Sequence, residues 1–216
     1  MMKLPFRDRC EAGRWLGAEL AARRVGENAL VLALVRGGVP VGAEVAEALH
    51  APLDVIVVRK LGVPWAPELA MGAVARGTRV LDRSLIAELG VSDKDVEAVA
   101  VRETAEMERR EKLYRHGHPE PNLEGRTVVL VDDGLATGSS MVAAARHVRG
   151  ANAHRVIVAV PVGTAEACQR LKDEADECIC LALPEPFHAV GEWYKDFRQV
   201  TDAEVREILK RSFSLH

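Results

Sequence analysis

Two adjacent carboxylates end an apolar run in the middle of the chain. Val128–Val131 is entirely aliphatic, and Asp132 and Asp133 follow it directly. Like charges side by side repel each other, and a buried carboxylate is costly unless it is paired or hydrogen-bonded. We therefore predict that a group outside the polypeptide uses this pair. Vicinal hydroxyls and a hydrated Mg²⁺ ion are partners that suit two neighbouring carboxylates.

A loop rich in glycine and hydroxyl groups comes next and leads into a predicted helix at Ser139–Arg149. Backbone N–H groups are unpaired at a helix start, where the helix dipole adds positive charge, and glycines let an anion approach closely. We predict a phosphate monoester site here, and an ordinary turn with Ser139 as N-cap is the alternative. The adjacent acid pair favours the ligand site. The predicted phosphate-binding residues are Gly134, Ala136, Thr137, Gly138, Ser139 and Ser140.

Five short apolar runs predict the strands that position these residues. They are rich in Val, Ile and Leu without strict alternation, which is typical of parallel strands buried on both faces. Helical patterns lie between most of them, so we predict an α/β fold with a five-stranded parallel sheet flanked by helices. The predicted strands are Ala29–Val35, Leu53–Val58, Thr127–Val131, Arg155–Val160 and Glu177–Leu181. The predicted helices are Glu11–Val25, Val41–His50, Ser139–Arg149 and Thr164–Ala175.

Three further segments depart from this alternation. Arg59–Pro67 contains two prolines and one glycine, so we predict a mobile loop. Gly72–Leu81 predicts a small hairpin that turns at Arg76-Gly77. Ser92–Arg115 predicts a long charged helix that begins with a variant capping box. A similar box at Thr201 begins the last helix. The predicted inward stripe of the long helix is Val96, Val99 and Met107.

The composition is that of a folded globular protein, with 48% hydrophobic and 28% charged residues among 216. A net charge of −3 argues against nucleic acid or an anionic membrane as a partner. No apolar run approaches the roughly 18–20 residues that span a bilayer. The cysteines, Cys10, Cys168, Cys178 and Cys180, form no Cys-x-x-Cys pair and have no His at zinc-ligand spacing, so we expect buried free thiols and a cytoplasmic location.

Val128–Ser140 resembles the 5-phosphoribosyl 1-pyrophosphate (PRPP) signature of type I phosphoribosyltransferases, in which an apolar strand leads into two acids and a Thr-Gly loop. The resemblance implies that Asp132 and Asp133 hold the ribose hydroxyls, directly or through Mg²⁺. It also implies that Gly134 and the loop to Ser140 wrap the 5-phosphate. Some purine-salvage members carry an Asp where this chain has Ala136, so no proton-transfer role is carried over to that position.

A second loop resembles the family's pyrophosphate loop. Gly37 and Gly38 free the backbone after the first strand, and Arg36 supplies permanent positive charge. In the family the peptide bond beside such glycines is often cis. Arg59 and Lys60, at the end of the second strand, could neutralise the leaving pyrophosphate. For the loop with Arg36, Gly37 and Gly38, the alternative is a plain Gly-rich turn with an exposed arginine.

The C-terminal segment 183–200 holds four of the nine aromatic residues and resembles the hood of hypoxanthine-type enzymes. Phe187 and Trp193 are therefore candidates for stacking on a base, and Asp196 is a candidate for reading its edge. The alternative is that these aromatics pin the hood to the core. Glu68 is the only acid in 59–73, and we consider it for handling the base or for a lid, against a plain solvated glutamate.

The resemblance divides the chain into a core at 1–183, a hood at 184–200 and a C-terminal helix at 201–216 that packs on the core. A flexible loop and hairpin lie at about 59–81. We expect a pentosyltransferase of nucleotide salvage that moves the 5-phosphoribosyl group from PRPP to a nitrogenous base, preferentially a purine, with Mg²⁺ and with release of pyrophosphate. Family members are commonly dimers or tetramers, which leaves a homodimer open. The expected catalytic residues are Asp132, Asp133, Arg36, Lys60 and Glu68.

Two alternatives to this activity stay open. Some proteins of the same fold sense PRPP or nucleotides and regulate transcription without notable catalysis. Others could retain the fold without any catalysis, because fold alone does not establish function.

Overall fold

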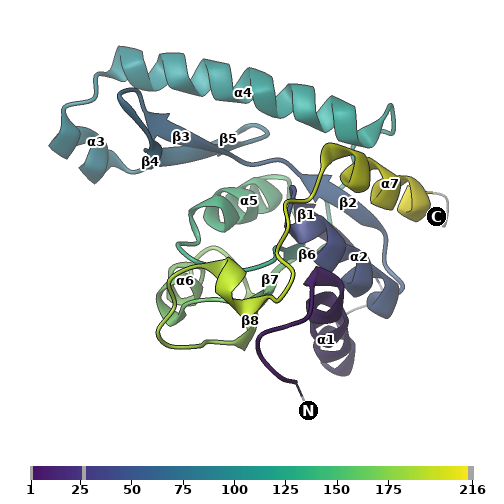
Figure 1. Cartoon of the computed structure of the whole chain (residues 1–216). Coiled ribbons are helices and arrows are strands. Elements are labelled where there is room, and N and C mark those ends of the chain that lie inside the picture. Colours follow the sequence, from purple (N-terminus) through teal and green to yellow (C-terminus); the bar gives the residue numbers. More distant parts are fainter. Residues whose placement is uncertain (1, 26–27, 214–216) are drawn as a thin grey trace.

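A five-stranded parallel sheet forms the centre of the computed structural model, which describes residues 2–25 and 28–213 (Figure 1). The strand order is β2-β1-β6-β7-β8. Each strand lies where an apolar run predicted it, to within two residues at either end, and the predicted fold class is confirmed. The strands are β1 (Ala29–Leu34), β2 (Leu53–Ile56), β6 (Thr127–Val131), β7 (Arg155–Val162) and β8 (Glu177–Ala182).

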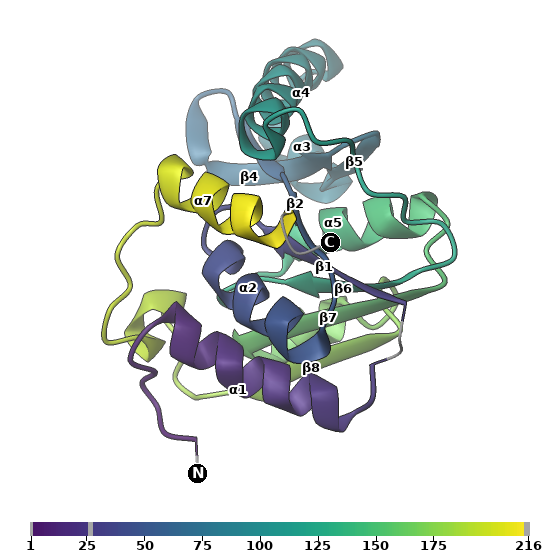
Figure 2. The same cartoon turned by 90° about the vertical axis from the view of Figure 1, so that its right-hand side faces the viewer.

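Alternate residues of these strands face two separate hydrophobic clusters. On β1, Val31 and Ala33 pack with helices α1, α2 and α7, whereas Leu30 and Leu32 pack with α5 and α6. Helices α1, α2 and α7 lie together on one face of the sheet (Figure 2). Burial on both faces explains why the strands read as continuous apolar runs. The helices are α1 (Arg9–Ala22), α2 (Gly38–Leu49), α5 (Ser139–Gly150), α6 (Ala165–Arg170) and α7 (Asp202–Phe213).

A smaller antiparallel sheet lies beside the main one and has its own hydrophobic cluster (Figure 1). The predicted loop at Arg59–Pro67 is wrong, because this segment forms one strand and the start of the next. Leu61 and Val63 alternate toward the buried side, and Gly62 packs so closely against Pro67 that a Cβ would clash. The elements of this unit are β3 (Arg59–Val63), β4 (Ala66–Ala75), β5 (Thr78–Leu81), α3 (Arg83–Leu89) and α4 (Asp93–Arg115).

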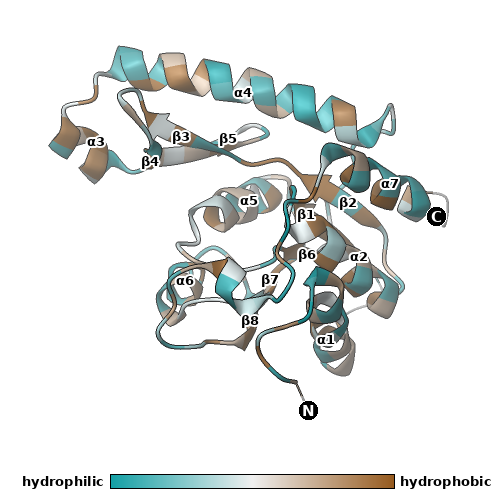
Figure 3. Ribbon diagram, in the orientation of Figure 1, coloured by the Kyte–Doolittle hydropathy of each residue, from teal (hydrophilic) through white to brown (hydrophobic). Residues whose placement is uncertain are grey.

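The hairpin predicted at Gly72–Leu81 is present as β4 and β5, and Gly77 adopts a positive φ of 65° at its turn. The long helix α4 begins as predicted, because the Ser92 side chain accepts a hydrogen bond from the backbone N–H of Asp95. Its residues are mostly hydrophilic, with apolar residues interspersed along the helix (Figure 3). The predicted stripe residues Val96, Val99 and Met107 are buried.

Helix α4 joins the small sheet to the main core. Val96 and Val99 pack in the cluster of the small sheet, whereas Met107 belongs to the main core. At its end, the Arg115 guanidinium donates to both carboxylate oxygens of Asp54 on β2 at 3.2 Å, in a buried ion pair. No helix within 2–25 or 28–213 is both long and apolar enough to cross a bilayer.

Candidate active site

The loops after β1 and β6 meet at the carboxyl edge of the sheet, because these strands are neighbours. Gly37 lies directly against the Asp133 carboxylate, where no Cβ would fit. At Gly38 a Cβ would lie 2.6 Å from the carbonyl oxygen of Val131. The Val35–Arg36 peptide bond, just before these glycines, is cis. The two loops can approach this closely only because the first contains two glycines.

The acid pair has internal partners. The Asp133 carboxylate accepts a hydrogen bond from Arg9 Nε at 2.8 Å, and Asp132 Oδ1 accepts one from the Asp133 backbone N–H at 2.8 Å. The Tyr194 hydroxyl donates to the carbonyl oxygen of Asp133 at 2.6 Å. Asp133 thus has an internal cation partner in Arg9, and the use of the pair by a group outside the polypeptide stays a prediction.

Burial dominates the electrostatics of the two acids. It raises the pKa of Asp132 well above the ordinary value, and the neighbouring Asp133 charge raises that pKa further. Burial also raises the pKa of Asp133, and the Arg9 guanidinium opposes this shift. Two carboxylates in this setting carry unfavourable charge that a cation or hydroxyl donors would relieve.

Arg9, which the sequence reasoning missed, links the acid pair to the C-terminal segment. Its side chain is 10% exposed, and its guanidinium lies 4.0 Å from the centre of the Phe197 ring. Its Nη1 donates to the carbonyl oxygen of Arg198 at 2.8 Å. The Asp8 side chain caps the start of α1 and so fixes the residue that follows it.

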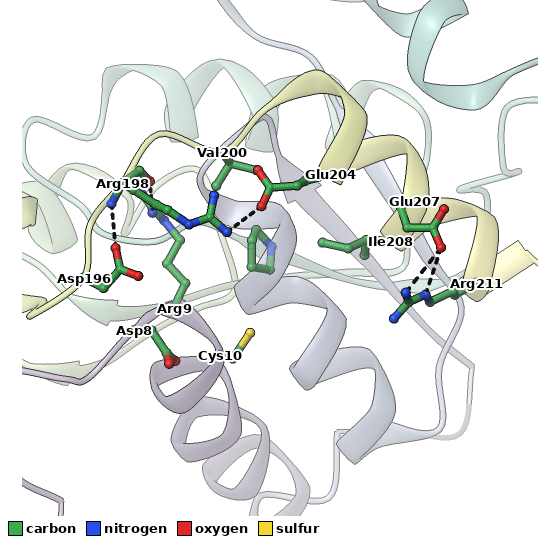
Figure 4. A pocket seen from close by; sticks show the side chains of 11 residues that line it. Asp8, Arg9, Cys10, Asp196, Arg198, Val200, Glu204, Glu207, Ile208 and Arg211 are labelled. Atoms are coloured by element: carbon green, nitrogen blue, oxygen red, sulfur yellow. Dashed lines mark hydrogen bonds and ion pairs between the residues drawn. The ribbon is translucent and has the colours of Figure 1, made fainter.

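Two hollows adjoin Arg9. One, of about 450 Å³, opens beside the acid pair, and Arg9, Arg36, Gly37 and Asp133 line it together with Phe197. The nearest charged partner of Arg36 is Asp202, at 3.5 Å. The other hollow, of about 370 Å³, shares Arg9 and lies between the starts of α1 and α7 (Figure 4). An anion-sized space therefore lies next to the acids and beside two arginines.

The phosphate loop is supported by a hydrogen bond from Thr164, and the start of the helix that follows it has no side-chain cap. Gly138 is the N-cap of α5, with φ at 79°, and no side chain caps the helix. The alternative with Ser139 as N-cap is therefore wrong, and the first N–H groups stay uncapped by any side chain. Thr164 Oγ1 donates to the carbonyl oxygen of Ala136 at 3.0 Å, while Thr137 is exposed.

A family model described as a phosphoribosyl transferase domain matches residues 14–196. This range contains both loops, the acid pair and most of the C-terminal hood segment. The chain belongs to the phosphoribosyl transferase family.

Relatives of known sequence and structure agree with this membership. "Putative phosphoribosyl transferase MT0597" of Mycobacterium tuberculosis (strain CDC 1551 / Oshkosh) is 45% identical over 212 residues, which are 98% of this chain and 47% of that protein. The chain thus spans about half the length of the curated relatives it matches. The crystal structure of TT1426 from Thermus thermophilus is 45% identical with a TM-score of 0.81, over 95% of this chain and 98% of that one.

A more distant structure shares the fold alone. It is a hypothetical protein from Neisseria gonorrhoeae with bound ppGpp, with a TM-score of 0.50 at 12% identity. The match covers 94% of this chain and 92% of that one.

The other pyrophosphate candidates of this phosphoribosyl transferase domain lie apart from the acid pair. Arg59 donates to Glu103 on α4 at 2.7 and 3.0 Å. Burial raises the pKa of Glu103, but hydrogen bonds from Arg59 and Arg102 outweigh it and the pKa is lowered. Lys60 and Glu68 are exposed on the small sheet. None of Arg59, Lys60 and Glu68 lines the hollow beside the acid pair, so the structure does not bring them to Asp133.

The hood aromatics mainly contact one another. Phe187 and Trp193 are stacked with ring centres 6.2 Å apart, and both pack against a cluster that contains Phe6. The buried Nε1 of Trp193 has no hydrogen-bond partner among residues 2–25 and 28–213, and the stacking of Phe187 or Trp193 on a base stays a prediction. Asp196 accepts from the Arg198 backbone N–H at 3.1 Å and lines the second hollow.

The hood is joined directly to the phosphate loop. Val190 packs against Gly134 so closely that a Cβ there would clash. The aromatic ring that lines the hollow together with Asp133 is that of Phe197, a residue that the sequence reasoning did not select. Its pairing with Arg9 spans the two ends of the chain, so no local pattern could have indicated it.

Proposed function

We propose that this domain transfers the 5-phosphoribosyl group from PRPP to a nitrogenous base, preferentially a purine, with Mg²⁺ and with release of pyrophosphate. The contact between the two loops is the observation that carries the proposal. Gly37 lies against the Asp133 carboxylate, and Arg36 shares their hollow. An opening lined by Asp133, the neighbour of Asp132 in the chain, and by Arg36 suits a substrate that carries both a diol and a pyrophosphate group.

In this reaction a nitrogen of the base attacks C1 of the ribose as the bond from C1 to the pyrophosphate oxygen breaks. Negative charge develops on the leaving group, so its neutralisation contributes more than a strong base would. Arg36 lines the hollow beside Asp133, which supports this role for its guanidinium. The loop Thr137–Ser140 would fix the distant 5-phosphate and so convert remote binding energy into alignment at C1.

The acid pair fits Mg²⁺ by its chemistry. Asp132 and Asp133 offer the carboxylate oxygens that this ion prefers, and Mg²⁺ commonly keeps waters and substrate phosphates as its other ligands. Within the described part of the chain, no group of three or more His, Cys, Asp or Glu could hold a metal ion. Two protein carboxylates suffice for an ion that is bound together with PRPP, where it would supply positive charge beside the pyrophosphate.

The purine preference has separate support. The hood contributes four aromatic side chains, and it adjoins the phosphate loop through Val190 and the acid pair through Tyr194. Recycling of bases in nucleotide salvage follows from the proposed reaction. Four free thiols among the described residues favour a reducing, cytoplasmic compartment.

Pyrophosphate release tests the proposal. Protein, PRPP and Mg²⁺ are incubated with a panel of purine and pyrimidine bases, and PRPP binding is measured in parallel by calorimetry. We expect release with at least one purine and none after Asp132→Asn with Asp133→Asn. PRPP binding without release for any base would favour the sensing alternative. Absence of PRPP binding would contradict the proposal as a whole.

A further inference from the structure

Arg36 contacts an acid that the proposed reaction does not use. Its Nη1 lies 3.5 Å from Oδ1 of Asp202, the first residue of α7. The same Oδ1 accepts a hydrogen bond from the Tyr114 hydroxyl at 2.7 Å. Helix α7 lies beside the end of α4, which carries Tyr114 (Figure 1). Three side chains in contact therefore connect the end of α4, the start of α7 and the loop after β1.

The Tyr114 end of this connection is fixed. Its side chain is only 1% exposed and packs in the main core. Burial and the Asp202 carboxylate raise the pKa of Tyr114 to about 12, so the hydroxyl keeps its proton and can donate it to the hydrogen bond near neutral pH.

The start of α7 fixes the backbone of Asp202. The Thr201 backbone N–H donates to the Glu204 carboxylate at 2.9 Å, and the Glu204 backbone N–H donates to Thr201 Oγ1 at 3.2 Å. This reciprocal capping encloses Asp202, which lies between the two residues in the chain. Together with the hydrogen bond from Tyr114, it holds the Asp202 carboxylate in one place.

The Arg36 end is a long side chain with many rotamers. A partly exposed ion pair contributes little to folding stability, so the contact with Asp202 acts mainly on the orientation of the guanidinium. A guanidinium has several N–H donors, and one edge can face Asp202 while others stay free for an oxyanion. Asp202 itself does not line the hollow beside Asp133, whereas Arg36 does.

We propose that Asp202, held by Tyr114, is a positioning residue that orients Arg36 for the pyrophosphate group of PRPP. This inference rests on the proposed function. A guanidinium that is ordered before the ligand arrives loses less conformational entropy when it binds an anion. Asp202 thus acts through Arg36 and not by contact with the substrate.

Charge alone predicts the opposite effect of Asp202. Removal of a carboxylate near a bound polyanion relieves repulsion and should tighten binding. Weaker binding after the loss of Asp202 therefore has the sign that positioning gives and that simple electrostatics does not.

The order of the Arg36 side chain tests the positioning without any ligand. It is measured by NMR as the heteronuclear NOE of the Arg36 Nε–H group, whose signal is assigned by its loss in Arg36→Met. We expect an ordered side chain in the wild type and a mobile one in Asp202→Ala. Tyr114→Phe keeps the ring and removes the hydroxyl, and it should give a smaller change in the same direction.

Glu207→Ala is the matched control, because it removes another acid of α7 that pairs with Arg211 at 3.3 Å. It should leave the Arg36 signal unchanged. The same NOE for Arg36 in the wild type and in Asp202→Ala would overturn the proposal.

Calorimetry with PRPP and Mg²⁺ tests the consequence for binding. We expect Asp202→Ala to bind PRPP about two- to tenfold more weakly than the wild type, as for one rotamer-rich side chain that must be immobilised on binding. Its affinity for ribose 5-phosphate, which lacks the pyrophosphate group, should stay the same. In an Arg36→Met background, Asp202→Ala should cause no further loss of PRPP affinity.

Unchanged or tighter PRPP binding in Asp202→Ala would contradict the role of Asp202, as would an equal loss with and without Arg36. Either result, with a wild type that binds PRPP, leaves the proposed function intact. A wild type that does not bind PRPP would overturn the proposed function and the role at pyrophosphate together, while the NMR measurement still decides whether Asp202 orders Arg36.

Discussion

The two halves of the candidate site are built in different ways. The phosphate loop is supported by a hydrogen bond from Thr164 to Ala136, and no side chain caps the start of α5. The acid pair is enclosed by remote groups, because Arg9 binds the Asp133 carboxylate and Tyr194 binds its carbonyl oxygen. The first half depends on a local sequence pattern. The second depends on contacts between segments far apart in the chain, so substitutions distant in sequence should affect it.

The largest effect should come from the acids themselves. Asp132→Asn with Asp133→Asn removes the charges that would hold the ribose diol and Mg²⁺, so we expect PRPP-dependent turnover to be abolished. Pyrophosphate release measures the loss, and circular dichroism shows whether the fold persists. Near-normal turnover in a folded double variant would refute the role of the pair.

Arg9→Met should have the next largest effect and tests whether the remote contacts matter. It removes the cation that holds Asp133 while keeping apolar packing on Phe197. Loss of a partner that orients a ligand-binding carboxylate typically costs about 10–100-fold in activity, and we expect kcat/KM to fall in that range. Arg14→Met is the matched control, because it lies on the same helix and pairs with Glu44 at 3.6 Å. If both variants lost activity equally, the effect would not be specific to the acid pair.

Thr137→Ala tests the local half of the site. Removing an exposed hydroxyl that would donate to a phosphate loses one hydrogen bond to a charged group, worth about 1.5–3 kcal/mol. We therefore expect ribose 5-phosphate to bind about tenfold more weakly or worse by calorimetry. Thr104→Ala on α4 is the control. Unchanged affinity would reject the loop as the phosphate site.

The smallest effect concerns stability. Burial and the Asp133 charge raise the pKa of Asp132, so the folded protein binds this proton more tightly than the unfolded chain does. The free energy of unfolding of the wild type should therefore fall as the pH rises above about 4, and Asp132→Asn should lack this loss. We expect the variant to be more stable at pH 7, by about 1.4 kcal/mol for each unit of pKa shift.

Urea unfolding across a pH series measures the difference between this variant and the wild type. The exposed Asp93→Asn is the control and should change little. A difference that did not depend on pH would contradict the account of Asp132.

Sequence reasoning succeeded where a pattern was local. The strands follow from apolar runs buried on both faces, and the acid pair with its glycine loop lies within a dozen residues. It failed at Arg59–Pro67, because the prolines indicated a loop while the alternation of Leu61 and Val63 produced a strand against β4. The ion pair of Arg59 with Glu103 on α4 was not foreseen either, and the role of Arg59 at pyrophosphate stays a prediction.

The contact between Arg9 and Asp133 joins residues separated by 124 positions, which no local pattern encodes. The Asp8-x-x-Glu11 pattern could have placed the start of α1 correctly, because the Asp8 side chain does cap that helix. Even so, this pattern would not have shown that Arg9, the residue after Asp8, contacts Asp133. For the same reason the sequence did not indicate that Phe197 lines the hollow beside Asp133, and the roles of Phe187 and Trp193 stay predictions.

Comparison of ribose 5-phosphate with 2-deoxyribose 5-phosphate by calorimetry tests most directly whether acids and phosphate loop hold opposite ends of one ligand. With Mg²⁺ present, we predict tighter binding of ribose 5-phosphate, and a preference that disappears in Asp132→Asn with Asp133→Asn. Equal affinity of the wild type for both sugars, or a preference that survives in the double variant, would contradict a diol held by those carboxylates.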